Sequence, residues 1–204
     1  MADSKSKLAA DAMSLEDIAA GITRCRGCAL WERATQAVGG EGSPRSRVML
    51  VGEQPGDQED HAGRPFVGPA GRVLDEALEK AGVDRSKVYV TNAVKHFSWE
   101  PRGKRRMHKT PSQQEIAACL DWLAAEIRLI GPALIVALGA TAVRALLGPG
   151  VRVLVNRGKA LPSEWGARVL VTVHPSSILR APPDDRERAF DALVRDLAAI
   201  KQLT

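Results

Sequence analysis

The chain has 204 residues, of which 45% are hydrophobic and 26% charged, and its net charge is +5. This balance is typical of a globular protein and excludes a disordered one, while the length favours a single domain over residues 1–204. No apolar run approaches about 18 residues, which excludes a transmembrane helix. The polar N-terminus lacks the pattern of a signal peptide, so we expect a flexible leader over residues 1–13 and a cytoplasmic protein without membrane contact.

Helix and strand patterns alternate along the chain. Ser14 and Asp17 form an N-cap pair that predicts a helix through Ile22. The patterns that follow predict a strand at 47–52, a helix at 71–81, a strand at 87–91, a long basic loop at 95–111, a helix at 112–130, a strand at 133–138, a helix at 141–147, an edge strand or hairpin arm at 151–155, a strand at 168–173 and a closing helix at 184–203.

This alternation predicts right-handed crossovers and an α/β fold. The strands are apolar throughout, as expected when helices cover both faces of a sheet. We therefore expect a three-layer αβα sandwich with about four mostly parallel strands. Polar segments follow four of these strands, at residues 52–60, at Asn92, at 138–141 and at 174–177. Because sites form beyond the carboxyl ends of parallel strands, we predict a site at this edge of the sheet.

The first of these segments, residues 52–60, combines glycine and proline with four carboxylates. Glycine lets the backbone approach a ligand closely, but no Gly-Lys-Ser/Thr follows, so the segment is not a nucleotide-binding P-loop. The alternative is a solvated acidic turn, and the position after a buried strand favours a site. His174, in His-Pro-Ser-Ser, is placed to donate a hydrogen bond to an oxygen that gains negative charge, or to serve only as a structural cap.

Two further residues suit recognition of a planar ligand. Phe66 lies in a proline- and glycine-rich loop, where an aromatic ring is held for stacking. Asn92 carries an amide that both donates and accepts, which matches the edge of a base. The alternatives are an ordinary core phenylalanine and an asparagine that caps a turn.

Residues 102–109 contain five basic residues and one histidine, which supplies the whole positive excess of the chain. A solvated charged face is the usual explanation of such a run. Because the rest of the chain is nearly neutral, the run instead indicates contacts with phosphate, and the positive net charge favours a polyanionic partner.

Three cysteines in a reducing compartment favour metal binding or reactivity over disulfides. Cys25 and Cys28 form a C-x2-C pair, which is ambiguous between redox chemistry and a metal site. With Cys119 they need a fourth ligand, for which His96 is the candidate. Such a set suits zinc or an iron–sulfur cluster, in which histidine can replace cysteine. The alternative is three unrelated thiols.

Taken in order, these motifs resemble the iron–sulfur, family 4-like uracil-DNA glycosylases from about Cys25 to the last helix. The chain is most similar to their X-type branch (UdgX) in three features: Gly-Glu-Gln-Pro-Gly at 52–56, Asn-Ala-Val-Lys-His-Phe at 92–97, and the inserted basic loop that ends in His108. Conventional members carry alanine or glycine at Gln54 and cysteine at His96, and they lack most of the loop. Met107 stands where the branch usually has isoleucine.

The resemblance implies a [4Fe-4S] cluster on Cys25, Cys28, His96 and Cys119. It implies recognition and excision of uracil in DNA, preferably single-stranded, and a covalent link from His108 to the sugar C1′. The residues we then assign to catalysis are His108, Glu53, Gln54, Asp57, Asp60 and His174. Those assigned to uracil are Gln54, Phe66, Asn92 and His174, and those assigned to DNA are Lys104, Arg105, Arg106, Lys109 and Ser176.

Other functions compete with this one. A conventional multiple-turnover uracil-DNA glycosylase shares every pocket residue and differs in what His108 does. A non-catalytic nucleic-acid-binding module with a structural metal needs only the basic loop and the cysteines, and leaves the polar groups at the strand ends unexplained. A thiol redox protein is a third alternative. We expect a monomer, because no long apolar helix stripe is left over.

Overall fold

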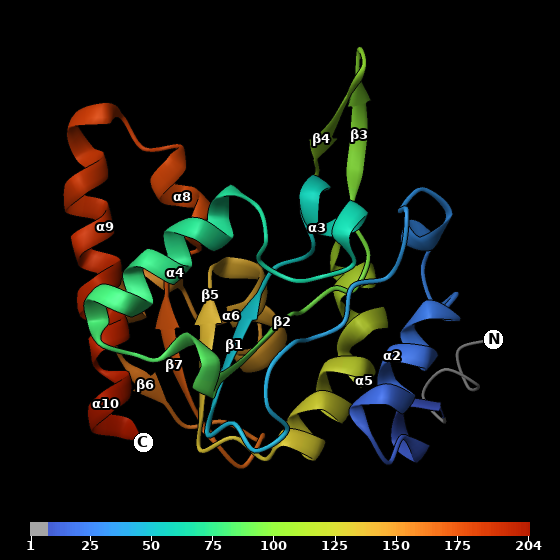
Figure 1. The fold of residues 1–204 in the computed structure, drawn as a ribbon, viewed down its shortest axis with the longest axis horizontal. Coiled ribbons are helices and arrows are strands. Elements are labelled where there is room, and N and C mark those ends of the chain that lie inside the picture. The colour runs from blue at the N-terminus through green and yellow to red at the C-terminus, as the bar shows by residue number, and fades with distance from the viewer. Residues whose placement is uncertain (1–7) are drawn as a thin grey trace.

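A computed structural model describes residues 8–204 and shows a five-stranded sheet in the order β2-β1-β5-β7-β6 (Figure 1). Four of these strands are parallel to one another, as predicted: β1 (Val48–Gly52), β2 (Val88–Asn92), β5 (Leu134–Leu138) and β7 (Arg168–Thr172). The fifth, β6 (Ala160–Leu161), pairs antiparallel with β7 and adds an edge that the sequence did not predict.

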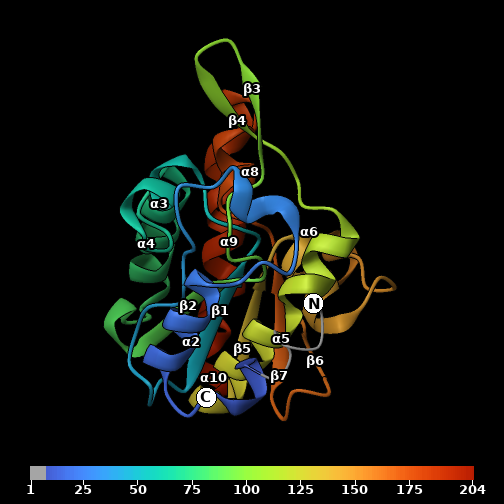
Figure 2. The ribbon, with the colours of Figure 1, turned by 90° about the vertical axis from the view of Figure 1, so that its right-hand side faces the viewer.

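Helices cover both faces of the sheet, which confirms the three-layer sandwich (Figures 1 and 2). On one face, Leu74 and Leu193 pack with Leu50 of β1; they belong to α4 (Pro69–Ala81) and α9 (Pro183–Ala198). On the other face, Leu123 and Val143 pack with Met49 of β1; they belong to α5 (Gln113–Ile130) and α6 (Ala140–Leu147). Adjacent residues of β1 thus enter different layers, as the strand period requires.

Helix ends follow the capping signals in the sequence. Ser14 caps α2 (Leu15–Thr23) in a capping box with Asp17, and Ser112 caps α5 with Glu115 in the same way. Short elements that the sequence patterns did not indicate complete the chain: η1 (Ala29–Glu32), α3 (Asp57–Ala62), η2 (Arg85–Lys87) and α8 (Ser176–Leu179).

Three sequence predictions are wrong in detail. Within the predicted loop 95–111 lies a hairpin of β3 (Trp99–Arg102) and β4 (Arg105–His108), turned at Gly103 with φ 61°. The hairpin projects from the carboxyl edge of the sheet (Figure 1). Its sequence therefore lacks the alternation of apolar and polar residues that marks a half-buried strand. Residues 151–155 form no strand, because the short helix α7 (Val153–Asn156) lies there and β6 takes the edge. The closing helix breaks at Ala199, between α9 and α10 (Ile200–Leu203).

The predicted leader is also partly wrong. Residues 1–7 lie outside the described structure, but residues 8–11 are helical, and Ala9 and Ala12 are buried against α2 and α5. The Arg128 guanidinium donates hydrogen bonds to the carbonyls of both alanines. Among residues 8–204, no helix has both the length and the apolar character that a membrane span requires.

Candidate active site

A cavity of about 750 Å³ opens at the carboxyl ends of the parallel strands, where the sequence predicted a site. It brings together residues from all four polar segments and from the hairpin. The predicted site residues that line it are Glu53, Gln54, Asp57, Phe66, Asn92, His108, His174 and Ser176. Asp60 and the hairpin residues 104–106 and 109 do not line it.

Asn92, the last residue of β2, presents an unused acceptor to this cavity. The residue is 3% exposed, and its Oδ1 has no hydrogen-bond partner within residues 8–204. A Cβ on Gly52 of the neighbouring strand would stand 2.4 Å from Asn92 Oδ1 and 2.5 Å from the Phe66 ring. Glycine at position 52 therefore lets the amide and the ring approach one another. An unpaired buried acceptor is costly, and a ligand donor would relieve that cost.

Phe66 is held in an unusual conformation. Its φ of 56° is left-handed, which an aromatic residue rarely adopts, so the loop imposes strain there. Gly71 packs so closely on the Phe66 carbonyl that a side chain at that position would collide with it. The Phe66 ring stacks with His174 at a centroid distance of 6.1 Å. The ring thus contacts His174 and lies near Asn92 across Gly52.

The protonation of His174 follows from its contacts. The Ser176 backbone N–H donates to Nδ1 at 3.2 Å, and the Ser176 hydroxyl lies 2.8 Å from the same nitrogen. Nδ1 is therefore an acceptor, and the ring proton resides on Nε2. Burial, with a contribution from Arg180, lowers the pKa of His174 to about 4. At neutral pH the ring is thus uncharged and offers an Nε2–H donor. Ser176, which we assigned to DNA, thus also orients His174.

Glu53 and His108 meet at the mouth of the cavity. His108 Nε2 lies 3.0 Å from Glu53 Oε1, and the Thr141 hydroxyl donates to the other carboxylate oxygen. Burial alone would raise the pKa of Glu53, but hydrogen bonds from His108 and Thr141 outweigh it and hold that pKa below its usual range. Glu53 is therefore an ionised carboxylate next to an imidazole that is half exposed.

Gln54 fixes the base of the hairpin. Its Nε2 donates to the carbonyls of Ser98 and Lys109 at 3.0 and 3.1 Å, and its Oε1 accepts from the Ser98 N–H at 3.0 Å. Both strands of the hairpin are thus clamped by one buried amide, next to His108. Gln54, which we assigned to uracil and catalysis, thus lines the cavity and also positions the hairpin.

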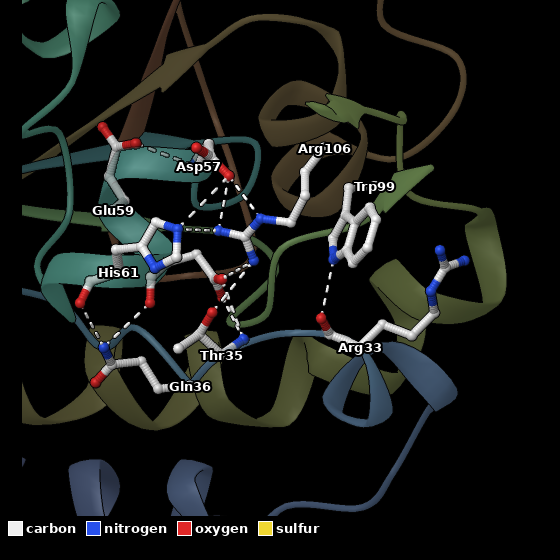
Figure 3. A network of polar contacts seen from close by, with 10 residues as sticks. Arg33, Thr35, Gln36, Asp57, Glu59, His61, Trp99 and Arg106 are labelled. Carbon is white, nitrogen blue, oxygen red and sulfur yellow. Dashed lines mark hydrogen bonds and ion pairs between the residues drawn. The ribbon is translucent and has the colours of Figure 1, made fainter. Parts of the chain in front are cut away.

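Asp57 and Asp60 also hold the hairpin, through Arg106 (Figure 3). Arg106 Nη2 lies 2.7 Å from Asp57, and Nη1 lies 2.6 Å from the fully buried Asp60. His61 Nε2 lies 2.7 Å from Nη2, and the Thr35 N–H donates to Asp60. The two carboxylates, which we assigned to catalysis, thus anchor Arg106, which we assigned to DNA. The exposed side chains of Lys104, Arg105 and Lys109 remain available for phosphate.

The three cysteines lie on elements that converge. The Cys119 thiol donates a hydrogen bond to Cys28, which together with burial raises the pKa of Cys119, and the Lys95 N–H also contacts that thiol. Trp122, one turn beyond Cys119 on α5, donates to Cys25 Sγ at 3.3 Å. Burial, together with Arg26, lowers the pKa of His96 to about 4, so its ring has a free lone pair. No three or more His, Cys, Asp or Glu side chains within residues 8–204 are grouped as a site for a metal ion.

Comparison with known proteins decides the family. The model of the uracil DNA glycosylase superfamily matches residues 40–198. The chain belongs to the uracil-DNA glycosylase superfamily. It is 39% identical over 176 residues to a type-4 uracil-DNA glycosylase of Thermotoga maritima, covering 85% of this chain and 88% of that protein.

Two further relatives show how far this superfamily likeness extends. A type-4 uracil-DNA glycosylase of Archaeoglobus fulgidus is 35% identical over 199 residues, covering 94% of this chain and 96% of that protein. A type-5 uracil-DNA glycosylase of Pyrobaculum aerophilum is 30% identical over 153 residues, covering 67% and 64%.

The sequence analysis missed two residues of this candidate active site, Thr141 and Glu59. Thr141, the hydrogen-bond partner of Glu53, follows β5 in the polar segment 138–141, so its position was the available signal. Glu59 is buried and accepts from the N–H groups of Gly56 and Gly68, which joins the two glycine loops at the cavity. The available signal was its position three residues after Gly56, which is the spacing of a capping box at the start of a helix.

Proposed function

We propose that the protein excises uracil from DNA, preferably single-stranded, and becomes covalently linked to the sugar through His108. The observation that carries the excision is the unpartnered Asn92 Oδ1, buried in a cavity beside a strained phenylalanine. Uracil offers an N–H donor and a carbonyl acceptor on one edge, which an asparagine amide complements. Phe66 supplies a flat surface for stacking. Extruding a base is least costly in a single strand, which favours that substrate.

Excision breaks the bond between C1′ and the base nitrogen, and the electron pair leaves with uracil. Negative charge then grows on the uracil oxygens, where the His174 Nε2–H donates. The sugar becomes oxocarbenium-like and carries positive charge. The ionised Glu53 carboxylate, at the mouth of the same cavity, stabilises that charge. A neutral donor and an anionic group therefore serve the two ends of the breaking bond.

His108 then takes the place that water has in a hydrolytic glycosylase. A ring-nitrogen lone pair forms the bond to C1′, and the imidazole releases its N–H proton to Glu53, which lies 3.0 Å from Nε2. The departing uracil anion takes up a proton from solvent. An alkylated imidazole is a poor leaving group, so the protein reacts once. The clamp of Gln54 and the Arg106 anchor support this proposal, because they hold the hairpin that carries His108 beside Glu53.

The linkage itself tests this function. Wild-type protein is incubated with a single-stranded oligonucleotide that contains one uracil, released uracil is measured, and the protein–DNA product is digested and mapped by mass spectrometry. We expect free uracil and a deoxyribose-linked peptide that contains His108. Released uracil with no linked peptide would support a multiple-turnover glycosylase instead, and retained DNA with no uracil release would support a binding module.

Replacing Gln54 with alanine is expected to slow linkage more than excision. The change leaves the Ser98 and Lys109 backbone groups unpaired and frees the hairpin, but touches none of Phe66, Asn92 and His174. A loss of about 1.4 kcal/mol or more in positioning corresponds to a linkage rate about tenfold slower or worse. Single-turnover gels measure both rates. Gln114→Ala, an exposed glutamine at the start of α5, is the control; equal slowing of both steps would count against a positioning role.

We also propose that Cys25, Cys28, His96 and Cys119 hold the iron–sulfur cluster that the family resemblance implies. Their chemistry fits, since three thiols and a neutral imidazole lie on the loop after α2, the segment that follows β2, and α5. When bound, the cluster would tie these segments together without taking part in the reaction. The protein should contain about four iron and four sulfide per chain, and Cys28→Ser should lose both. His96→Cys, which restores the usual ligand, should keep them; iron without sulfide, or zinc, would contradict the proposal.

A further inference from the structure

A second cavity, of about 520 Å³, lies at the opposite edge of the sheet from the active site. It is bounded by the segments that lead into β1 and β2 and by α10, near the C-terminus at the foot of Figure 1. Val48 and Val88 line it, and the same two strands end at Gly52 and Asn92 beside the active site. Each strand spans about 13 Å from its first residue to its fifth, so a ligand here lies apart from the active site.

The cavity has an excess of positive charge. Arg45, Arg47, Lys87 and Lys201 line it, and the acidic residue among the described lining residues is Asp84. Asp84 is already paired with Lys87 at 3.6 Å. No ion pair within residues 8–204 involves Arg45, Arg47 or Lys201. Three cations therefore face one concavity without a carboxylate partner.

A buried hydroxyl lies among these cations. Ser46, between the two arginines in sequence, lines the cavity and is 4% exposed. Its Oγ has no hydrogen-bond partner in the described part of the chain. Buried polar groups in proteins are nearly always paired, so an orphan in the wall of a cavity points to a ligand that supplies the partner.

The remaining wall narrows the class of ligand. It includes four aliphatic side chains, those of Val48, Val83, Val88 and Ile200, besides Ser43, Gly82, Ser86 and Thr204, and no aromatic ring is among its described lining residues. A bare oxyanion would leave most of the volume and the aliphatic wall unused. A nucleobase would find no surface for stacking. A phosphate backbone binds exposed cationic faces, not an aliphatic concavity. A peptide matches the cavity better: its carboxylates suit the cations, an aliphatic side chain suits the valines and Ile200, and a backbone polar group suits the Ser46 hydroxyl.

We propose that this cavity docks an acidic segment of a partner protein. Carboxylates of the segment pair with Arg45, Arg47 and Lys201, an aliphatic side chain lies against Val83 and Ile200, and a backbone group pairs with the Ser46 hydroxyl. The partner and the DNA occupy opposite edges of the sheet, so both bind at once. This role is separate from uracil excision and does not depend on it.

The probe for this site is a fluorescein-labelled octapeptide of alternating aspartate and leucine, followed by anisotropy with the full chain. We expect saturable binding that weakens with salt, and Arg45→Glu/Arg47→Glu should weaken it about tenfold or more. Ser46→Ala should weaken it less. Arg102→Glu/Lys104→Glu, a matched charge reversal on the hairpin, should leave it unchanged. The Arg45/Arg47 variant should still release uracil as the wild type does.

Four outcomes would overturn the proposal. The peptide does not bind; it binds the Arg45/Arg47 variant as tightly as the wild type; a glycine-for-leucine peptide binds equally well, which removes the aliphatic wall from the interaction; or inorganic phosphate displaces the peptide at equal concentration, which makes the cavity a simple anion site. Because the readout is peptide anisotropy, a protein without glycosylase activity would still give a clear result.

Discussion

Glu53→Gln is expected to slow uracil release about a hundredfold to a thousandfold, the range found when one electrostatic group aimed at developing charge is removed. The substitution keeps the size of the side chain and its hydrogen bond with Thr141, but removes the charge that stabilises the sugar cation and accepts the His108 proton. Linkage should fall at least as far as release. Single-turnover release of uracil from a single-stranded oligonucleotide measures the effect.

Glu100→Gln is the control for this change, since Glu100 is exposed on the hairpin. The pH profile gives a second check. The pKa of Glu53 lies below its usual range and that of His174 is about 4, so neither group changes its charge between pH 7 and about 5. These two groups should therefore leave the rate of uracil release unchanged over that range. A Glu53→Gln protein that releases uracil at a near-normal rate would remove Glu53 from the reaction.

Lys95→Met is expected to destabilise the fold by about 3–5 kcal/mol, as breaking a buried ion pair does. Lys95 is 1% exposed and Glu126 is fully buried, with Nζ 2.7 Å from Glu126 Oε2. Nζ also donates to Thr91 Oγ1 at 2.8 Å and to the Asn92 carbonyl at 2.7 Å. Without it, Glu126 keeps the hydrogen bonds from Tyr89 and Thr91 but has no opposite charge. Urea unfolding at neutral pH measures the loss.

The matched control is Lys80→Met, which breaks an exposed pair with Glu76 at 3.2 Å and should cost at most about 1 kcal/mol. The double variant Lys95→Met/Glu126→Gln removes the stranded charge and should recover part of the stability. Equal losses in Lys95→Met and Lys80→Met would show that the buried pair contributes little. Since Lys95 also holds the Asn92 carbonyl, surviving Lys95→Met protein should bind uracil more weakly.

Much of the fold was predictable because its signals are local. The parallel strands are short apolar runs, and the capping boxes at Ser14 and Ser112 mark helix starts directly. The hairpin was not, because both of its faces are polar and no alternation appears in residues 99–108. Three valines suggested a strand at 151–155, but the edge position belongs to β6, and only the folded sheet shows which segment reaches it.

The candidate site divides in the same way. The rule that sites follow the carboxyl ends of strands placed Glu53, Asn92 and His174 together without any structure. The contacts of Gln54, Asp57 and Asp60 with the hairpin were not predictable, because their partners lie more than 40 residues away: the Ser98 carbonyl for Gln54, and Arg106 for the two aspartates. Residue type gives no indication whether a carboxylate faces a substrate or an arginine from a distant hairpin.

The central claim is that His108, held beside Glu53, forms the covalent bond to DNA. Wild-type protein and His108→Ser are each mixed with a uracil-containing oligonucleotide and run on a denaturing gel. The account predicts a shifted band that survives heat and detergent for the wild type, and for His108→Ser no such band but DNA that alkali cleaves at the abasic site. A stable band that persists in His108→Ser, or a wild type that yields only alkali-cleavable DNA, would contradict it.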